Sequence, residues 1–299
     1  MKTIHQLTTT ALFCLLLIFT ACQKEQTTPP LTTQEEEQAA LASSESEAES
    51  EFLMNDIFDN VLGVNAEVGM GGTGIFGRSI TNGRVDSLAS CASVTFTPAS
   101  ATATFPLKVV IDFGTGCVGR DGRTRSGKLS IVYTGRLILP GNSATTSFDG
   151  YKVNNVLIEG THKITNNSSS AILQFKVEVN GKMSKAGGNY IQWVSNRIIT
   201  QMEGSVTPLY PFDDLFAITG SSNGTVKRNT LVITWESNIT QALQKRFTCS
   251  WIAAGKIQTT RKNAATSGEW TGELNFGGGD CDNQAILIIN GKTHQITLY

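Results

Sequence analysis

The sequence is poor in charge and in histidine. Charged residues make up only 16% of the 299 positions, and 24 Lys and Arg nearly balance 25 Asp and Glu. Such a near-neutral chain gives no reason to expect a nucleic-acid partner. Of three histidines, only His162 and His294 lie beyond the first 21 residues. Each shares a face of an expected strand with apolar residues, which favours a structural role over a catalytic one.

Signatures of common catalytic classes are also scarce. Residues 72–77 match G-x-G-x-x-G, but they neither follow a strand nor open a helix, so a nucleotide loop is not expected. No strand–turn–helix elbow carrying a serine is expected. Asp213 and Asp214 are adjacent and would point apart in a strand, unlike the facing carboxylates of a glycosidase. We therefore predict a protein that is not an enzyme and has no cofactor.

The N-terminus predicts export. Lys2 is followed by an apolar run, Ala11–Phe19, which is too short to span a bilayer. The run ends in Thr20-Ala21-Cys22, which resembles the lipobox of bacterial lipoproteins. The resemblance implies a signal peptide over residues 1–21 and a lipid on the Cys22 thiol. Because no later segment approaches ~20 apolar residues, the expected membrane contact is this lipid anchor.

Composition changes abruptly after Cys22. Residues 22–51 are rich in Gln, Thr, Ser, Ala and Glu and predict an acidic low-complexity tether. Residues 52–88 predict a short helix and a glycine-rich connection, because Leu53, Ile57 and Val61 recur at helical spacing. That helical pattern extends back toward Gln34, with only the last turns expected to dock on the domain.

Residues 89–299 predict a β domain. Between Ala171 and Asn180, apolar residues on one face alternate with more polar residues on the other, as expected for an antiparallel strand with one face in the core. Similar segments recur, separated by turn pairs such as Asp149-Gly150 and Asn290-Gly291. We predict an all-β fold, an antiparallel multi-stranded meander with a short N-terminal helix. Sandwich, barrel and curled sheet all fit this pattern.

Four cysteines remain after the signal peptide and the lipidated Cys22 are set aside: Cys91, Cys117, Cys249 and Cys281. An even number in an exported chain predicts two disulfides, with three possible connectivities. Pairs 91–117 and 249–281 are favoured because each flanks a short run of strand pattern. A zinc site is disfavoured because paired C-x-x-C spacing is absent.

Several segments together resemble a family of uncharacterised Bacteroidetes lipoproteins, over most of residues 45–299. The matching segments are Asp86-Ser87, Cys91, Asp112–Cys117, Gly122–Lys128 and Gly279–Asn283. The resemblance implies an outer-membrane lipoprotein and no particular activity. It also implies that Lys24-Glu25 acts as a signal for cell-surface exposure and that Ser87 accepts an O-linked glycan.

Two groups of residues are candidates for ligand binding. Arg120, Arg123, Arg125 and Lys128 lie in a glycine-punctuated segment that could meet a phosphate, sulfate or uronate, or could simply be a solvated loop. Asp280, Asp282 and Asn283 offer oxygen ligands for calcium. The same residues also suit a tight turn beside a disulfide.

The inward phase of Trp235, Trp251 and Trp270 argues against an exposed sugar-stacking platform, whereas Trp193 fits either face. The function expected is therefore a non-catalytic binding or structural role in the envelope. One alternative is a carrier or chaperone with an apolar hollow lined by Phe175 and Tyr133. Another is a polysaccharide-acting enzyme with convergent acids. The sequence specifies neither a protein nor a glycan ligand.

Overall fold

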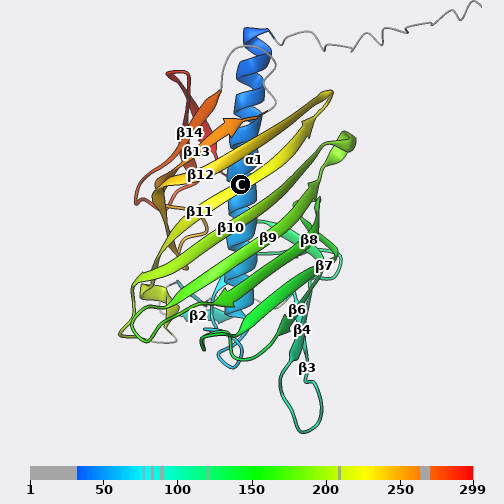
Figure 1. The fold of residues 1–299 in the computed structure, drawn as a ribbon. Helices are drawn as coiled ribbons and strands as arrows, with labels where there is room; N and C mark the ends of the chain where they lie inside the picture. The colour runs from blue at the N-terminus through cyan, green and yellow to red at the C-terminus, as the bar shows by residue number, and fades with distance from the viewer. Residues whose placement is uncertain are drawn as a thin grey trace, which may run out of the picture. The chain divides into compact units, whose positions relative to one another are not determined.

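The computed structural model describes residues 32–76, 78–81, 84–87, 91–119, 121–207, 210–262 and 270–298. Within the unit Leu31–Tyr299, one long helix lies inside a curled antiparallel sheet (Figure 1). The prediction of an antiparallel multi-stranded meander with an N-terminal helix is confirmed. Of the three arrangements considered, the structure is the curled, open sheet.

The main sheet contains 14 of the described strands, and neighbours along the chain are nearly always neighbours in the sheet, in the order β16 back to β6, then β4 and β3. Its strands are β3 (Ser93–Thr97), β4 (Leu107–Asp112), β5 (Cys117–Val118), β6 (Thr124–Tyr133), β7 (Ser143–Val153), β8 (Val156–Asn166), β9 (Gln174–Ser184), β10 (Tyr190–Glu203), β11 (Leu215–Arg228), β12 (Leu231–Arg246), β13 (Ala254–Arg261), β14 (Thr271–Gly278), β15 (Gln284–Ile289) and β16 (Lys292–Thr297). β1 (Arg78–Thr81) and β2 (Arg84–Ser87) form a separate hairpin. Short 3-10 turns are η1 (Gly74–Phe76), η2 (Ala186–Gly188) and η3 (Pro211–Asp213).

The strands form because their side chains alternate between core and solvent. In β9, Phe175, Val177 and Val179 are buried, while the residues between them are partly exposed. The buried face packs on the helix: the rings of Phe58 and Phe175 meet edge to face at 5.6 Å. Tyr133 donates a hydrogen bond from its hydroxyl to the Val61 carbonyl, at 2.8 Å. The core is therefore the contact between one sheet face and one helix.

The helix α1 (Thr33–Gly63) is 31 residues long, which corresponds to about 46 Å. It begins with a capping box, in which Thr32 accepts from the Glu35 amide and Glu35 accepts from the Thr32 amide. It ends at Gly63, where a Cβ would lie only 2.0 Å from the Thr73 carbonyl oxygen. Close passage of the following chain therefore requires glycine at this position.

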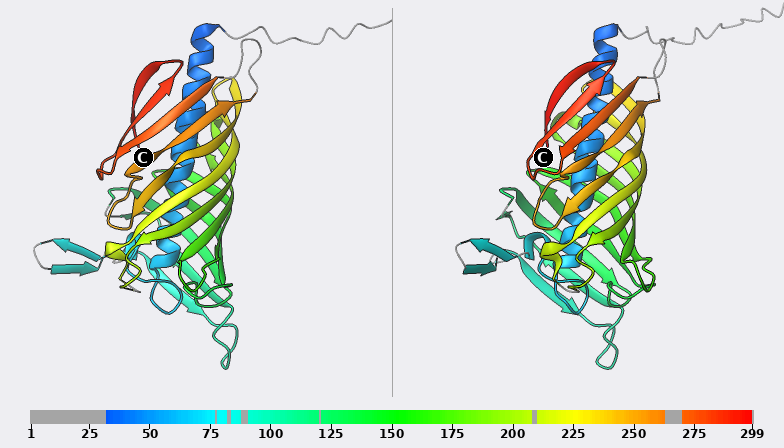
Figure 2. Two further views of the ribbon diagram at one scale, coloured as in Figure 1. Left: turned by 60° about the vertical axis from the view of Figure 1, so that its left-hand side comes forward. Right: turned by 90° about the vertical axis from the view of Figure 1, so that its left-hand side faces the viewer.

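The sheet wraps around α1 for most of the helix's length (Figure 2). Small side chains make this enclosure possible in the first half of the helix. Ala39, Ala40 and Ala42 are almost completely buried, as are Ser43 and Ser46. The two buried serines donate their hydroxyls to carbonyls four residues earlier in the helix, so their burial leaves no lost hydrogen bond.

This burial corrects the expected domain boundaries. The helix back to Gln34 agrees with the expected helical pattern, but residues 33–51 are mostly enclosed by the sheet and do not form a solvated tether. The helix is also not short, and it docks along its length and not through its last turns alone. The tether prediction failed because the inward positions are Ala, Ser and Glu, whose composition is typical of a solvated segment. Residues 22–31 lie outside the described residues.

Both predicted disulfides are confirmed, Cys91–Cys117 and Cys249–Cys281. The first links the chain before β3 to the short strand β5. The second links the β12–β13 loop to the β14–β15 loop. Among the described helices, none is both long enough and apolar enough to cross a bilayer.

Candidate functional site

The interface between α1 and the sheet is the most charged region of the interior. The helix carries nine acidic residues and no basic residue. Eight of the acids form ion pairs with cations of the sheet or its turns: Glu36–Arg261, Glu37–Lys292, Glu45–Arg228, Glu47–Arg197, Glu49–Lys185, Glu51–Arg197, Asp56–Arg125 and Asp59–Lys245. The negative charge of the helix is thus balanced by positive charge on the sheet face that encloses it.

Arg197 occupies the centre of this interface. Its Nη2 lies 2.7 Å from Glu47 Oε1 and its Nε lies 2.9 Å from Glu51 Oε2, with all three side chains about 1% exposed. Glu47 also accepts hydrogen bonds from the Ser222 hydroxyl and the Trp235 indole N–H. Burial raises the pKa of Glu51, and the Arg197 charge only partly opposes this shift. These buried groups form hydrogen bonds and ion pairs with one another, as expected of a network that stabilises the structure.

A second buried pair joins the end of α1 to β12. Lys245 Nζ lies 2.9 Å from Asp59 Oδ2. The same ammonium donates to the Cys249 carbonyl at 2.6 Å, next to the second disulfide. Burial raises the pKa of Asp59 to about 6, although Lys245 favours its ionised form. Lys245 therefore ties the helix to the disulfide-bonded loop.

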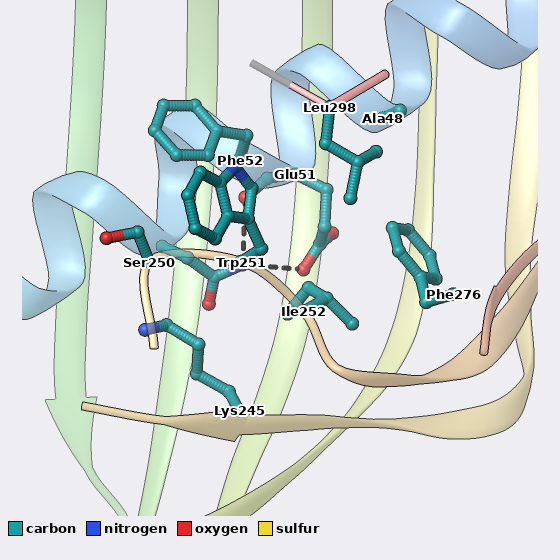
Figure 3. Close-up of a pocket in the computed structure, with 10 residues that line it drawn as sticks. Ala48, Glu51, Phe52, Lys245, Ser250, Trp251, Ile252, Phe276 and Leu298 are labelled. Carbon is teal, nitrogen blue, oxygen red and sulfur yellow. Dashed lines mark hydrogen bonds between the residues drawn. The ribbon is translucent and has the colours of Figure 1, made fainter. Parts of the chain in front are cut away.

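A small pocket lies where this loop covers α1 (Figure 3). Phe52 from the helix lies beside Trp251 from the β12–β13 loop, and the lining also includes Ile252, Phe276 and Leu298. The cavity measures about 10 Å³, which is at most the space of one water molecule. It is too small for a substrate or an apolar cargo.

Phe52 is covered on another side by Arg123, whose guanidinium carbon lies 3.8 Å from the ring centroid. This distance is typical of a cation–π contact. Phe52 thus contacts two segments. The β12–β13 loop carries a cysteine of the second disulfide, and the segment leading into β6 follows a cysteine of the first. The side chain therefore links two segments that are distant in the sequence.

The structure corrects the predicted anion-binding loop. Arg125 is buried and pairs with Asp56 and Asp121, at 2.5 and 2.8 Å. Arg123 also pairs with Asp121, at 2.9 Å. Although burial alone would raise the pKa of Asp121, the two arginines hold it at about 2. Both arginines therefore form ion pairs with acids of the protein itself.

Of the other two members of that group, only Lys128 lies within the described residues. Lys128 lies 3.1 Å from Asp112, on the neighbouring strand. Arg120 lies outside the described residues. In the described part of this segment, both arginines are therefore used in packing and are not free to bind an external anion.

The calcium candidates lie in the turn before β15. Asp282 accepts a hydrogen bond from the Gln284 amide at 2.8 Å, and Asn283 accepts from the Gln284 side chain at 2.7 Å. Within the described ranges, no group of three or more His, Cys, Asp or Glu side chains could hold a metal ion. These contacts favour the turn interpretation over a metal site.

The two histidines occupy different environments. His162 is fully buried against α1, and burial lowers its pKa to about 4. His294 lies near the surface, with Nε2 3.6 Å from Glu37. Trp193, whose face the sequence left open, points inward and is 2% exposed. The described tryptophans offer no fully exposed stacking surface.

The residues named as candidates for a carrier cavity or for paired catalytic acids lie elsewhere than those functions would need. Phe175 and Tyr133 contact α1 and are fully buried in the core between helix and sheet. Asp213 and Asp214 use different partners, with Asp213 accepting from Thr207 and Asp214 accepting from Gln201. Burial raises the pKa of Asp214 to about 6. The two carboxylates do not face a common cleft.

A G-x-S-x-G pattern does occur, at residues 220–224. It lies within β11 and not at a strand–turn–helix elbow. Its central Ser222 is buried and donates to Glu47. The pattern therefore serves the helix–sheet interface and has no nucleophile geometry.

Cys22, Lys24 and Glu25 lie outside the described residues, and Ser87 lies in β2 with its side chain outside the description. Comparison with known proteins finds no protein family, no curated protein and no solved structure that matches the chain. The resemblance to Bacteroidetes lipoproteins stays an expectation from the sequence.

Proposed function

We propose that this chain is a lipid-anchored lipoprotein of the cell envelope, held in the outer membrane through Cys22, with a non-catalytic binding or structural role. The apolar run before Thr20-Ala21-Cys22 supports export and anchoring. The two disulfides fit an oxidising compartment outside the cytoplasm.

The observation that carries the non-catalytic part is the position of α1. The helix fills the concave side of the sheet, where a carrier or an enzyme would hold its ligand. The interior acids of α1 are paired with arginines and lysines. An interior of this kind is a core, so binding is expected on the outer surface.

The early start of α1 also bears on the anchor. Nine residues lie between Cys22 and Thr32, so the ten steps of this connection span at most about 36 Å. A lipid on Cys22 would therefore hold the β domain close to the bilayer.

Replacement of Cys22 by Ala tests the anchor. We expect the variant to leave the membrane fraction and to lose labelling by a radioactive fatty acid. Cys14→Ala, which changes a cysteine within the expected signal peptide, is the matched control and should keep both properties. Fatty-acid label that persists in the Cys22→Ala protein would contradict the proposal.

A further inference from the structure

A cavity of about 200 Å³ lies at the ends of β10 and β11. Its polar lining comes from the strand ends and their turns, and no acidic residue is part of it: Lys185, Asn189, Tyr190, Lys227, Arg228 and Asn229. The Asn189 side chain accepts a hydrogen bond from the Asn229 amide at 2.7 Å, which joins the two turns. We call this cavity the rim pocket.

The rim pocket keeps a net positive charge. Lys185 and Arg228 pair with Glu49 and Glu45 of α1, at 2.6 and 2.5 Å. For Lys227, no carboxylate in the described part of the chain lies within ion-pair distance. The lining thus has three cations and no acid, and the Lys227 ammonium suits an anionic group of modest size.

Below the rim pocket, the outer face of the sheet carries exposed uncharged polar side chains on β9–β13, the strands that cross α1 in Figure 1. We call them the outer polar array: Asn180, Gln192, Asn196, Ser221, Asn223, Asn238 and Gln258. Cross-strand partners continue from the pocket into the array, because Tyr190 opposes Lys227, Gln192 opposes Thr225, Val194 opposes Asn223 and Asn196 opposes Ser221. Alternate residues of a strand share a face, so these pairs form one continuous surface.

The array is costly for the fold. Asparagine is disfavoured in strands, yet Asn180, Asn196, Asn223 and Asn238 occupy interior positions of four neighbouring strands. In turns of this protein asparagines bind the backbone, as Asn142 does with the carbonyls of Arg136 and Leu139. Across the described residues, the array side chains make no hydrogen bond to another part of the protein. Their amides are left free to donate and accept.

We propose that the rim pocket and the outer polar array form one binding site for a polysaccharide that bears anionic groups, carboxylate or phosphate. The cations of the pocket bind the anionic group, and the half-buried Tyr190 ring offers a surface for a sugar. The carboxamides and hydroxyls of the array pair with sugar hydroxyls. Glu178 lies opposite Asn196 and Glu236 lies opposite Asn223, but these acids pair with Lys176 and Lys262. Because the face around the array therefore has no excess of positive charge, a nucleic acid fits it poorly.

This proposal rests on the non-catalytic binding function given above, and it names the ligand class. The full chain carrying Cys22→Ala would be run through gels containing alginate, whose sugars bear carboxylates, or a phosphomannan, whose sugars bear phosphates. Dextran is the neutral comparison. We expect retardation by at least one of the anionic polymers, weaker retardation by dextran, and a loss of retardation as salt is raised.

Two variants locate the site. Lys227→Ala removes a charge-assisted contact and should weaken binding about tenfold. Asn196→Thr with Asn223→Thr removes two carboxamides, keeps side chains favourable in strands, and should weaken binding by a similar factor. The matched control Lys108→Ala removes an exposed lysine of the outer face of β4, far along the sheet order, and should bind as the parent does.

Equal losses in Lys227→Ala and Lys108→Ala would overturn the proposal, because the attraction would then be nonspecific. Retardation by dextran as strong as by the anionic polymers, or none by any polymer, would also overturn it. Shortening of the polysaccharide, together with weaker binding by the Lys227 variant, would support the site but refute a non-catalytic function. Failure of the anchor is read separately, from membrane fractionation.

Discussion

Arg197 Nε of β10 lies 2.9 Å from Glu51 Oε2 of α1, and both side chains are about 1% exposed. This contact joins the middle of the sheet to the middle of the helix. A buried ion pair adds little stability compared with an apolar pair of the same shape, but removal of one partner leaves an unpaired buried charge. The relationship therefore predicts an asymmetric response to mutation.

Arg197→Ala should destabilise the fold by about 3–5 kcal/mol, because Glu47 and Glu51 lose their common partner inside the core. Arg228→Ala is the matched control, since its pair with Glu45 is partly exposed and should cost no more than about 1 kcal/mol. Urea unfolding at pH 7 of the two variants measures the difference. Similar midpoints would show that the Arg197 network is not buried as described.

The fold class and the disulfide pairs could be predicted because strand alternation and cysteine spacing are local signals. The helical pattern back to Gln34 could also be predicted, but the burial of the helix along its length could not. Many of its inward positions carry Ala, Ser and Glu where a hydrophobic stripe is normally sought. A nonlocal signal was present: α1 has nine acids and no base, while Arg125, Arg197 and Arg261 occupy inward positions of strands. Only the assembled sheet brings these charges together. For the same reason, Arg123 and Arg125 looked available for a ligand.

His162 predicts a pH dependence. Burial lowers its pKa from 6.5 to about 4, so the folded protein keeps it neutral where the unfolded chain protonates it. The stability linked to neutral His162 is therefore present above pH 6.5 and is lost as pH falls toward 4. A shift of this size corresponds to about 3 kcal/mol.

The measurement is the difference in unfolding free energy between the parent and His162→Leu at pH 7 and at pH 4. A difference between the two proteins is needed because burial also raises the pKa values of Asp59 and Asp214 to about 6. These two groups make the folded state more stable as pH falls, in both proteins alike. The unfolding free energy of the parent, relative to that of the variant, should be lower at pH 4 than at pH 7. An unchanged difference between the two pH values would mean that His162 titrates normally.

The two disulfides should differ in importance despite similar loop lengths. Sequence separations of 26 and 32 residues give each bridge about 3.5 kcal/mol by loop entropy. The Cys249–Cys281 bridge also holds the loop of Trp251 over α1, and the Cys249 carbonyl accepts a hydrogen bond from Lys245. Its removal should therefore destabilise the fold more. Thermal unfolding of the paired alanine variants compares them. A larger loss from Cys91→Ala with Cys117→Ala would contradict this ranking.

Surface exposure is expected from the Lys24-Glu25 sequence that follows the lipidated cysteine. Protease added to intact cells should degrade the protein, and replacement of Lys24 and Glu25 by Ala should protect it. A periplasmic protein, which must stay intact in both cases, controls for cell integrity. Protection of the unmutated chain would place the domain on the periplasmic side.

Gly181 and Trp193 give the last prediction. The two residues are cross-strand partners in β9 and β10, and a Cβ on Gly181 would lie 2.5 Å from the buried Trp193 ring. Gly181→Ala should therefore cost about 1–3 kcal/mol, because the ring cannot move without disturbing the core. Gly278→Ala in β14, where no atom lies within 4 Å of the added Cβ, should instead gain about 0.5–1 kcal/mol from the lower entropy of the unfolded chain. Opposite signs in urea unfolding are expected, and a gain at both positions would show that Trp193 does not lie over Gly181.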